Sequence, residues 1–367
     1  MNVSPTSIAK GSFFEHLSPL KQKHFIDLFT PHGNLVMTVT RSGHPNIQSY
    51  ASSVVSSKEG ITTKQFTPND KFEKINVHSG IKPFHAGLLI SFINELKEKD
   101  PKIKVPELSL EELAVLSASH SGTRIHRTHV RSALEKVGLN ESYMTCGGRY
   151  PSDEESRNRL IKADIIPSKT PIIYDQCSGH HACQGILSKL MDKPLENYWK
   201  PNDTVQEWLL QELKKCSNDD DIKIIPYDNC NIPTFNLSLG TFANLYSKFV
   251  SEPQFKLIIE AMTKHPFLVG SETSLDSCLM NITSGNLIAK LGAEGLVIVI
   301  NKKEESCLVL KEWGGNGGYR DRITIQTLRE IGWLNHGQAA TLSRLPNFKL
   351  EDEKHNVKYE FNKPLFR

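Results

Sequence analysis

The stretch GLVIVINKKEESCLVLKEW, residues 295–313, decides the fold of this chain. Its two apolar segments flank the polar turn NKKEES, and this pattern predicts a β-hairpin. Near the start of the chain, NLVMTVTRSG (34–43) and SYASSVVSSKEGITT (49–63) predict further strands joined by turns. Strands are therefore expected at both ends of the chain.

The middle of the chain is predicted to be mainly helical. Apolar residues between Ser79 and Lys97 recur near helical spacing, and Pro83 lies in the first turn, where proline is tolerated. Ser109 and Glu112 form a capping-box pattern that predicts the start of another helix. We therefore expect an α/β fold, in which an antiparallel sheet built from both chain ends carries an inserted, mainly helical region.

The whole chain, 1–367, is expected to form one interlocked unit, because strands distant in sequence share a sheet. The sheet regions are expected at about 30–76 and 290–335, and the helical region at about 79–275. Residues from about 336 to 367 are predicted to form a polar C-terminal tail.

The composition argues against several classes of function. Formal net charge is +3 with both signs interspersed, which gives no support for nucleic-acid binding. No apolar run is long enough to span a membrane, and the first residues contain no apolar signal core. We therefore expect a cytoplasmic protein. Its seven cysteines include no C-x-x-C pair, which argues against a disulfide framework and a standard zinc finger.

One candidate for chemistry is Ser79-x-x-Lys82, within VHSGIKPF (77–84). Three residues make nearly one helical turn, so both side chains would project from one face. A serine hydroxyl needs a base to become a good nucleophile, and a neutral lysine can supply that base. On spacing alone, a helix N-cap with a surface lysine is the favoured interpretation.

Three other stretches contain candidate polar residues. SASHSGTRIHRTHV (117–130) follows a predicted helix and includes Ser119 and His120 in a turn. Lys290 precedes the strongly apolar strand, where it could be a surface residue or point into a cleft. QCSGHHACQG (176–185) could be a metal site, part of an active site or a buried helix start. We found neither a Walker A loop nor a dinucleotide-binding pattern, so no organic cofactor is expected.

Read in order, these stretches resemble the L-asparaginase II family, the rhizobial type of asparaginase. The resemblance runs from about residue 41 to the strand near Lys311. Its motifs are RSG (41–43), SGIKPF (79–84), ELAVLSASHSG (112–122), CGGRYPSD (146–153), CSGHHA (177–182), DNCNIP (228–233) and KLGAEG (290–295). The resemblance implies a fold like that of serine β-lactamases and glutaminases, in a single catalytic unit that hydrolyses L-asparagine to aspartate and ammonia.

The resemblance also implies roles for individual residues. Ser79 would attack the side-chain amide, Lys82 and Ser119 would move protons, and Lys290 would keep the charge balanced, through an acyl-enzyme. The implied substrate contacts are Arg41, His120, Ser178, Gly179, His181 and Asp228. The expected partner is a small-molecule amide substrate, and members of the family often form homodimers.

The resemblance further implies a zinc ion near the substrate, held by Cys146 and Cys177. Arg149 departs from the ligand that the family has at that position, and His180 is a candidate substitute. Two free buried thiols are the alternative interpretation. Further departures from the family pattern are Gln48, His78, His85, Asn229 and Asn231.

The retained serines and lysines favour an amidohydrolase acting on L-asparagine. The altered residues around them leave two alternatives open. One is activity on another amide, glutamine-like or cyclic. The other is a protein that binds a ligand and catalyses weakly.

Overall fold

The computed structural model describes residues 33–60, 62–65 and 70–362. The start of the first predicted sheet region and the last five residues of the predicted tail lie outside the described residues. Its main feature is an antiparallel sheet with the strand order β10-β11-β1-β2-β9-β8-β7, in which β3 also pairs with β2. The strands are β1 (Asn34–Arg41), β2 (His44–Ser57), β3 (Thr62–Gln65), β7 (Leu287–Leu291), β8 (Leu296–Asn301), β9 (Ser306–Glu312), β10 (Glu351–Asp352) and β11 (Val357–Phe361). The prediction of a sheet built from both chain ends is confirmed.

The apolar run in β8 is explained by burial on both faces of the sheet. Leu296, Ile298 and Ile300 pack into the core beneath the helical region. Val297 and Val299 point the opposite way, into a second core, because side chains alternate across a strand. That second core is covered by α13 (Leu275–Ile282), α14 (Gly317–Glu330) and α15 (His336–Arg344). A strand in this position requires apolar residues on both faces, which is the pattern of the opening stretch.

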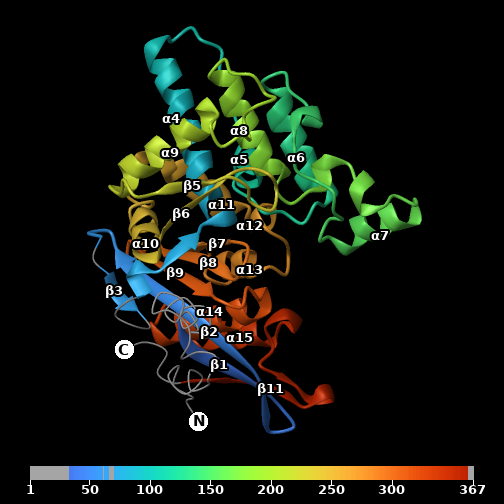
Figure 1. Cartoon of the computed structure of the whole chain (residues 1–367), viewed down its shortest axis with the longest axis vertical. Coiled ribbons are helices and arrows are strands. Elements are labelled where there is room, and N and C mark those ends of the chain that lie inside the picture. The colour runs from blue at the N-terminus through green and yellow to red at the C-terminus, as the bar shows by residue number, and fades with distance from the viewer. Residues whose placement is uncertain (1–32, 61, 66–69, 363–367) are drawn as a thin grey trace, which may run out of the picture.

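The inserted region lies on the other side of the sheet, in the upper half of Figure 1. Its helices are α4 (Lys82–Lys99), α5 (Leu110–Leu116), α6 (Arg124–Glu135), α7 (Glu154–Lys162), α8 (Ser178–Leu190), α9 (Thr204–Ser217), α10 (Leu239–Ser247), α11 (Lys256–Lys264) and α12 (Pro266–Val269). A small antiparallel sheet joins β4 (Lys74–Asn76), β6 (Thr234–Ser238) and β5 (Lys223–Ile225). The mainly helical insertion is therefore also confirmed.

Two local predictions can be compared directly with the structure. The capping box of Ser109 and Glu112 is present at the start of α5. The helix expected to begin at Ser79 instead starts with a short 3-10 helix, η2 (His78–Ile81), and continues as α4 from Lys82. Pro83 therefore lies in the first turn of α4, where a missing N–H costs nothing.

The polar segment after residue 336 contributes to the sheet. It forms α15 and then β11, which pairs with β1 from Met37↔Phe361 to Arg41↔Val357. The pairing places one end of the described chain beside the other (Figure 1). Within the described ranges, no helix is long and apolar enough to cross a membrane.

Replacing Ile298 by alanine tests the two-sided core. Ile298 is 1% exposed in β8, and truncation should lower the free energy of unfolding by about 2–5 kcal/mol, because it removes buried methyl groups and leaves a cavity. The matched control is Ile47→Ala in β2, where the side chain is 39% exposed and the expected loss is below about 1 kcal/mol. Chemical denaturation measures both. Equal losses would contradict the two-sided burial of β8.

Candidate active site

The centre of the candidate site is the hydroxyl of Ser119, which lies between two lysine amines. Lys82 Nζ donates to Ser119 Oγ at 3.1 Å, and Lys290 Nζ donates to the same oxygen at 2.9 Å. Lys82 Nζ also donates to Ala118 O at 3.0 Å and contacts Cys177 Sγ at 3.2 Å. The structure therefore brings together Lys82 of α4, Ser119 of the loop after α5, Cys177 before α8 and Lys290 of β7.

Ser79 lies beside this cluster in η2, which packs against α4 and against β7. Its side chain is half-buried, and its backbone carbonyl accepts from the backbone N–H of Lys82. The η2 turn is also held by α10, because the hydroxyl of Tyr246 donates to Gly80 O at 2.6 Å. Among the described residues, the hydrogen bonds of both lysine amines go to partners other than Ser79.

The two lysines have different protonation tendencies. Burial, together with the charge of Lys82, lowers the pKa of Lys290 to about 7. Burial also acts to lower the pKa of Lys82, but the neighbouring Cys177, Cys230 and Asp228 raise it above the ordinary lysine value overall. Near neutral pH, Lys290 is therefore the amine that can be uncharged, and Lys82 keeps its proton.

Cys177 is the acidic thiol of the site. A hydrogen bond from Cys230 and the charge of Lys82 lower the pKa of Cys177 to about 6, against the opposing effect of burial. Burial raises the pKa of Cys146 instead. The thiol in contact with Cys177 is thus that of Cys230, in the DNCNIP motif, and sequence reasoning did not single out this cysteine.

The predicted zinc ligands do not form a complete donor set. Within the described ranges, no group of three or more His, Cys, Asp or Glu side chains is arranged to hold a metal ion. Arg149 Nε donates to Asp175 at 2.6 Å, and His180 Nε2 lies 2.9 Å from His85 Nδ1. Because the donors present do not fit a zinc site, no step of the reaction is assigned to a metal.

Several predicted substrate contacts belong to the packed interior of the helical region. His120 Nε2 lies 2.9 Å from Ser178 Oγ, and both side chains are fully buried. His181 bonds to Cys230 O through Nε2 at 3.0 Å and to Tyr198 through Nδ1. A Cβ on Gly179 would lie 1.9 Å from Val115 O. These groups position α8 against its neighbours.

The two other predicted contacts lie far apart in the fold. Arg41 is exposed at the tip of the β1–β2 hairpin, where Ser42 and Gly43 make a tight turn. The structure does not bring Arg41 to the lysine cluster, because Arg41 pairs with His44 and Val357 in β2 and β11, whereas Lys290 lies on β7 at the opposite edge of the sheet. Asp228 does lie at the site, where its carboxylate contacts the imidazole of His78 at 2.9 Å.

His78 and Glu294 are site residues that sequence reasoning did not predict. His78 Nε2 lies 3.1 Å from Glu294 Oε2, in the turn between β7 and β8. The available signals were the position of His78 directly before Ser79 and the KLGAEG motif after Lys290. Their contact depends on long-range packing and cannot be derived from spacing.

Most of the departures from the family pattern take part in contacts with one another or with neighbouring motifs. His85 pairs with His180. Arg149 Nη2 donates to Asn229 O at 3.2 Å, and Asn231 Nδ2 donates to Thr145 O at 2.6 Å. Gln48 is exposed on β2 and accepts from Tyr50 at 3.3 Å. The residues at these positions thus have hydrogen-bond partners in the structure.

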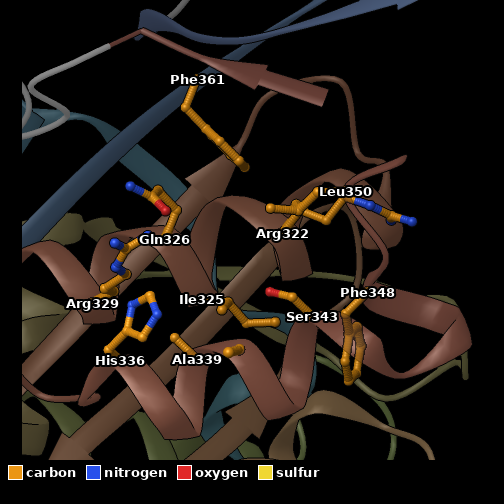
Figure 2. A pocket seen from close by; sticks show the side chains of 11 residues that line it. Arg322, Ile325, Gln326, Arg329, His336, Ala339, Ser343, Phe348, Leu350 and Phe361 are labelled. Carbon is orange, nitrogen blue, oxygen red and sulfur yellow. The ribbon is translucent and has the colours of Figure 1, made fainter. Parts of the chain in front are cut away.

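A separate cavity of about 190 Å³ lies between α14, α15 and β11 (Figure 2). Ile325, Ala339 and Phe348 line its apolar part, and the side chains of Arg329 and His336 lie at its edge. It contains none of the residues predicted for catalysis. This cavity is therefore distinct from the candidate site.

Replacing Gly179 by alanine tests the packing of α8. The added Cβ would meet backbone atoms of α5, which cannot rotate away, so we expect a loss of about 1–3 kcal/mol in the free energy of unfolding. The control is Gly317→Ala in α14, where the nearest atom is the flexible Arg320 Nη2 at 3.6 Å. Thermal or chemical unfolding measures both. A stable Gly179→Ala protein with altered substrate affinity would favour the substrate contact instead.

Comparison with solved structures gives distant likenesses. A protein described as a 6-aminohexanoate-dimer hydrolase from Bacillus anthracis is 12% identical, with a TM-score of 0.34, over 88% of this chain and 82% of its own. EstCE1, a hydrolase with promiscuous acyltransferase activity, is 11% identical, with a TM-score of 0.32, over 82% and 94%. No curated protein matches significantly. At these scores neither structure carries an argument about this chain.

Comparison with protein families gives a match over most of the chain. The family model described as L-asparaginase II matches residues 37–359. The match agrees with the motifs between RSG and KLGAEG and supports an amidohydrolase activity. This chain belongs to the L-asparaginase II family.

Proposed function

We propose that this protein hydrolyses the side-chain amide of L-asparagine to aspartate and ammonia, with Ser79 as the nucleophile. The observation that carries the proposal is the Ser119 hydroxyl held between Lys82 and Lys290, beside the turn that contains Ser79. Ser119, next to one neutral and one charged amine, can pass a proton between Ser79 and those amines. Family membership supports the amide as the bond that is cleaved.

In the proposed reaction, Ser79 Oγ bonds to the amide carbon, and its proton passes to the site base. The tetrahedral intermediate then collapses with cleavage of the C–N bond, and the leaving nitrogen takes a proton and departs as ammonia. Water attacks the resulting ester, which releases aspartate and restores the Ser79 hydroxyl. Each step needs one group that accepts a proton and later returns it.

The protonation tendencies favour Lys290 as that group. Its pKa of about 7 makes it uncharged in a large fraction of molecules at neutral pH, and Ser119 connects it to the rest of the cluster. Lys82 stays charged beside Cys177 and supplies positive charge to the developing oxyanion. This proposal exchanges the roles that the resemblance implied for the two lysines.

The activity test is ammonia release from L-asparagine, L-glutamine and D-asparagine by the purified protein and by Ser79→Ala. We expect release from L-asparagine and a loss of about a thousandfold or more in kcat for Ser79→Ala, with unchanged far-UV circular dichroism. Ser91→Ala in α4 is the control, because Ser91 Oγ donates within the same helix, to Gly87 O one turn earlier. Ammonia release from another of these amides, without release from L-asparagine, would show that the substrate is that amide. A folded protein silent on every amide would refute the proposed activity.

The pH dependence tests the role of Lys290. The base must be uncharged, so kcat/KM should rise about tenfold per pH unit below the Lys290 pKa of about 7 and stop rising above it. Lys290→Gln should lower kcat/KM by about a hundredfold or more and remove this limb. Cys177 is the other group near the site whose pKa lies close to this range, at about 6, and Cys177→Ser tests whether its thiol causes the limb. A limb that survives Lys290→Gln but disappears in Cys177→Ser would contradict the assignment.

A further inference from the structure

The imidazole of His78 is bonded to a carboxylate at each of its two nitrogens. Nδ1 lies 2.9 Å from Asp228 Oδ1, and Nε2 lies 3.1 Å from Glu294 Oε2. A neutral imidazole has one N–H and one lone pair, so it could donate to only one of these carboxylates. Both contacts are favourable together only when the ring is an imidazolium.

The backbone of His78 is held in a conformation that few residues adopt. Its φ is +43°, in the left-handed region, directly before Ser79. Histidine enters this region more readily than most side chains. The backbone N–H donates to Thr234 Oγ1 at 2.9 Å, which fixes the start of η2 against β6. Strain of this kind persists where surrounding contacts enforce it.

The two carboxylates come from separate parts of the fold. Asp228 belongs to the loop between β5 and β6 in the helical region, and Glu294 belongs to the turn between β7 and β8 in the main sheet. The side chain of His78 is 5% exposed and that of Asp228 is 11% exposed. His78 therefore links loop 226–233 to the sheet turn that follows Lys290, with Ser79 next to the link.

The other charged groups around this link are cations. Lys82 lies on α4 and Lys290 on β7, the elements packed against η2. Lys311 of β9 donates to Glu294 O and lies 3.9 Å from Glu294 Oε2. Asp228 also accepts from the backbone N–H of Asn229 at 2.7 Å. The ring nitrogens of His78 themselves contact the two carboxylates of Asp228 and Glu294.

We propose that His78 is a positioning residue that, as an imidazolium, ties the Asp228 loop to the Glu294 turn and so holds Ser79 in its reactive position. The inference rests on the proposed function for its effect on catalysis, but the link itself can be measured without any activity. The expected consequence is that kcat falls on the alkaline side. An arginine at this position would not lose its proton in the same range.

The direction of this fall follows from the pKa of His78. Burial acts to lower that pKa, but Asp228 and Glu294 raise it overall above the ordinary histidine value. The stabilising link is therefore complete below the unfolded value of about 6.5 and is lost as the pH rises through the folded value. Above it, one nitrogen presents a lone pair to a carboxylate and the link opens.

The first experiment compares pH profiles of the native protein, His78→Arg and His78→Gln. The native kcat should fall on the alkaline side, with KM changing less, because the loss lies in the placement of the nucleophile. His78→Arg keeps donors for both carboxylates and should remove this alkaline fall, whereas His78→Gln should be at least about tenfold slower at every pH. His355→Gln is the control, an exposed histidine paired with Asp352 at 2.7 Å, and should leave the profile unchanged. An unaltered alkaline fall in His78→Arg would overturn the proposal.

The second experiment measures the link in the Ser79→Ala protein, where no turnover occurs. In the protein labelled with ¹⁵N-histidine, the resonance that disappears in Ser79→Ala/His78→Gln identifies His78. It should titrate above the ordinary histidine value, and Asp228→Asn or Glu294→Gln should each lower its apparent pKa. A His78 pKa at or below the ordinary histidine value, or one that neither replacement changes, would overturn the link even if the amidase is active. A protein with the link intact but no amidase activity would refute only the proposed function.

Discussion

Two buried amines, those of Lys82 and Lys290, share the hydroxyl of Ser119, and the arrangement around them follows from that constraint. Two ammonium ions at this separation in a low-dielectric interior repel each other, so the site favours one charged and one neutral lysine. The acidic thiol of Cys177 lies on the side of Lys82. Which lysine keeps its proton is thus decided by the position of the negative partner.

The main sheet positions Lys290 and the η2 turn for this arrangement. β8 and β9 are buried along their whole lengths, so their positions between two cores are fixed. β7 pairs with β8 from Leu287↔Asn301 to Leu291↔Val297, and this register places Lys290 opposite Ile298. Ile298 packs beneath η2, since its Cδ1 lies 2.5 Å from where a Cβ on Gly80 would be. The apolar hairpin therefore positions both the neutral lysine and the turn that contains Ser79.

Several departures from the family pattern contact one another or neighbouring motifs. His85 contacts His180, Arg149 contacts the backbone of Asn229, and His78 contacts the aspartate that precedes Asn229. A buried polar group without a partner is costly, and these contacts supply partners for His85, His180 and His78. The altered residues keep the loop of Asp228 attached to the helical region and to η2, and this attachment favours a site that is retained in a modified form.

The sequence by itself determined the periodicities and motifs of this protein. The hairpin around NKKEES, the strands near the start, the capping box at Ser109 and the order of motifs predicted an α/β fold with a helical insertion, because these are local patterns of polarity and turn chemistry. The same motifs named Ser79, Lys82, Ser119 and Lys290. Only the tertiary structure decided that Cys230 lies against Cys177, that His120 and His181 are used in packing, and that His78 joins Asp228 to Glu294. Protonation tendencies and contacts between distant segments depend on burial and on neighbours that lie between 49 and 216 residues away in these contacts, and no local pattern contains that information.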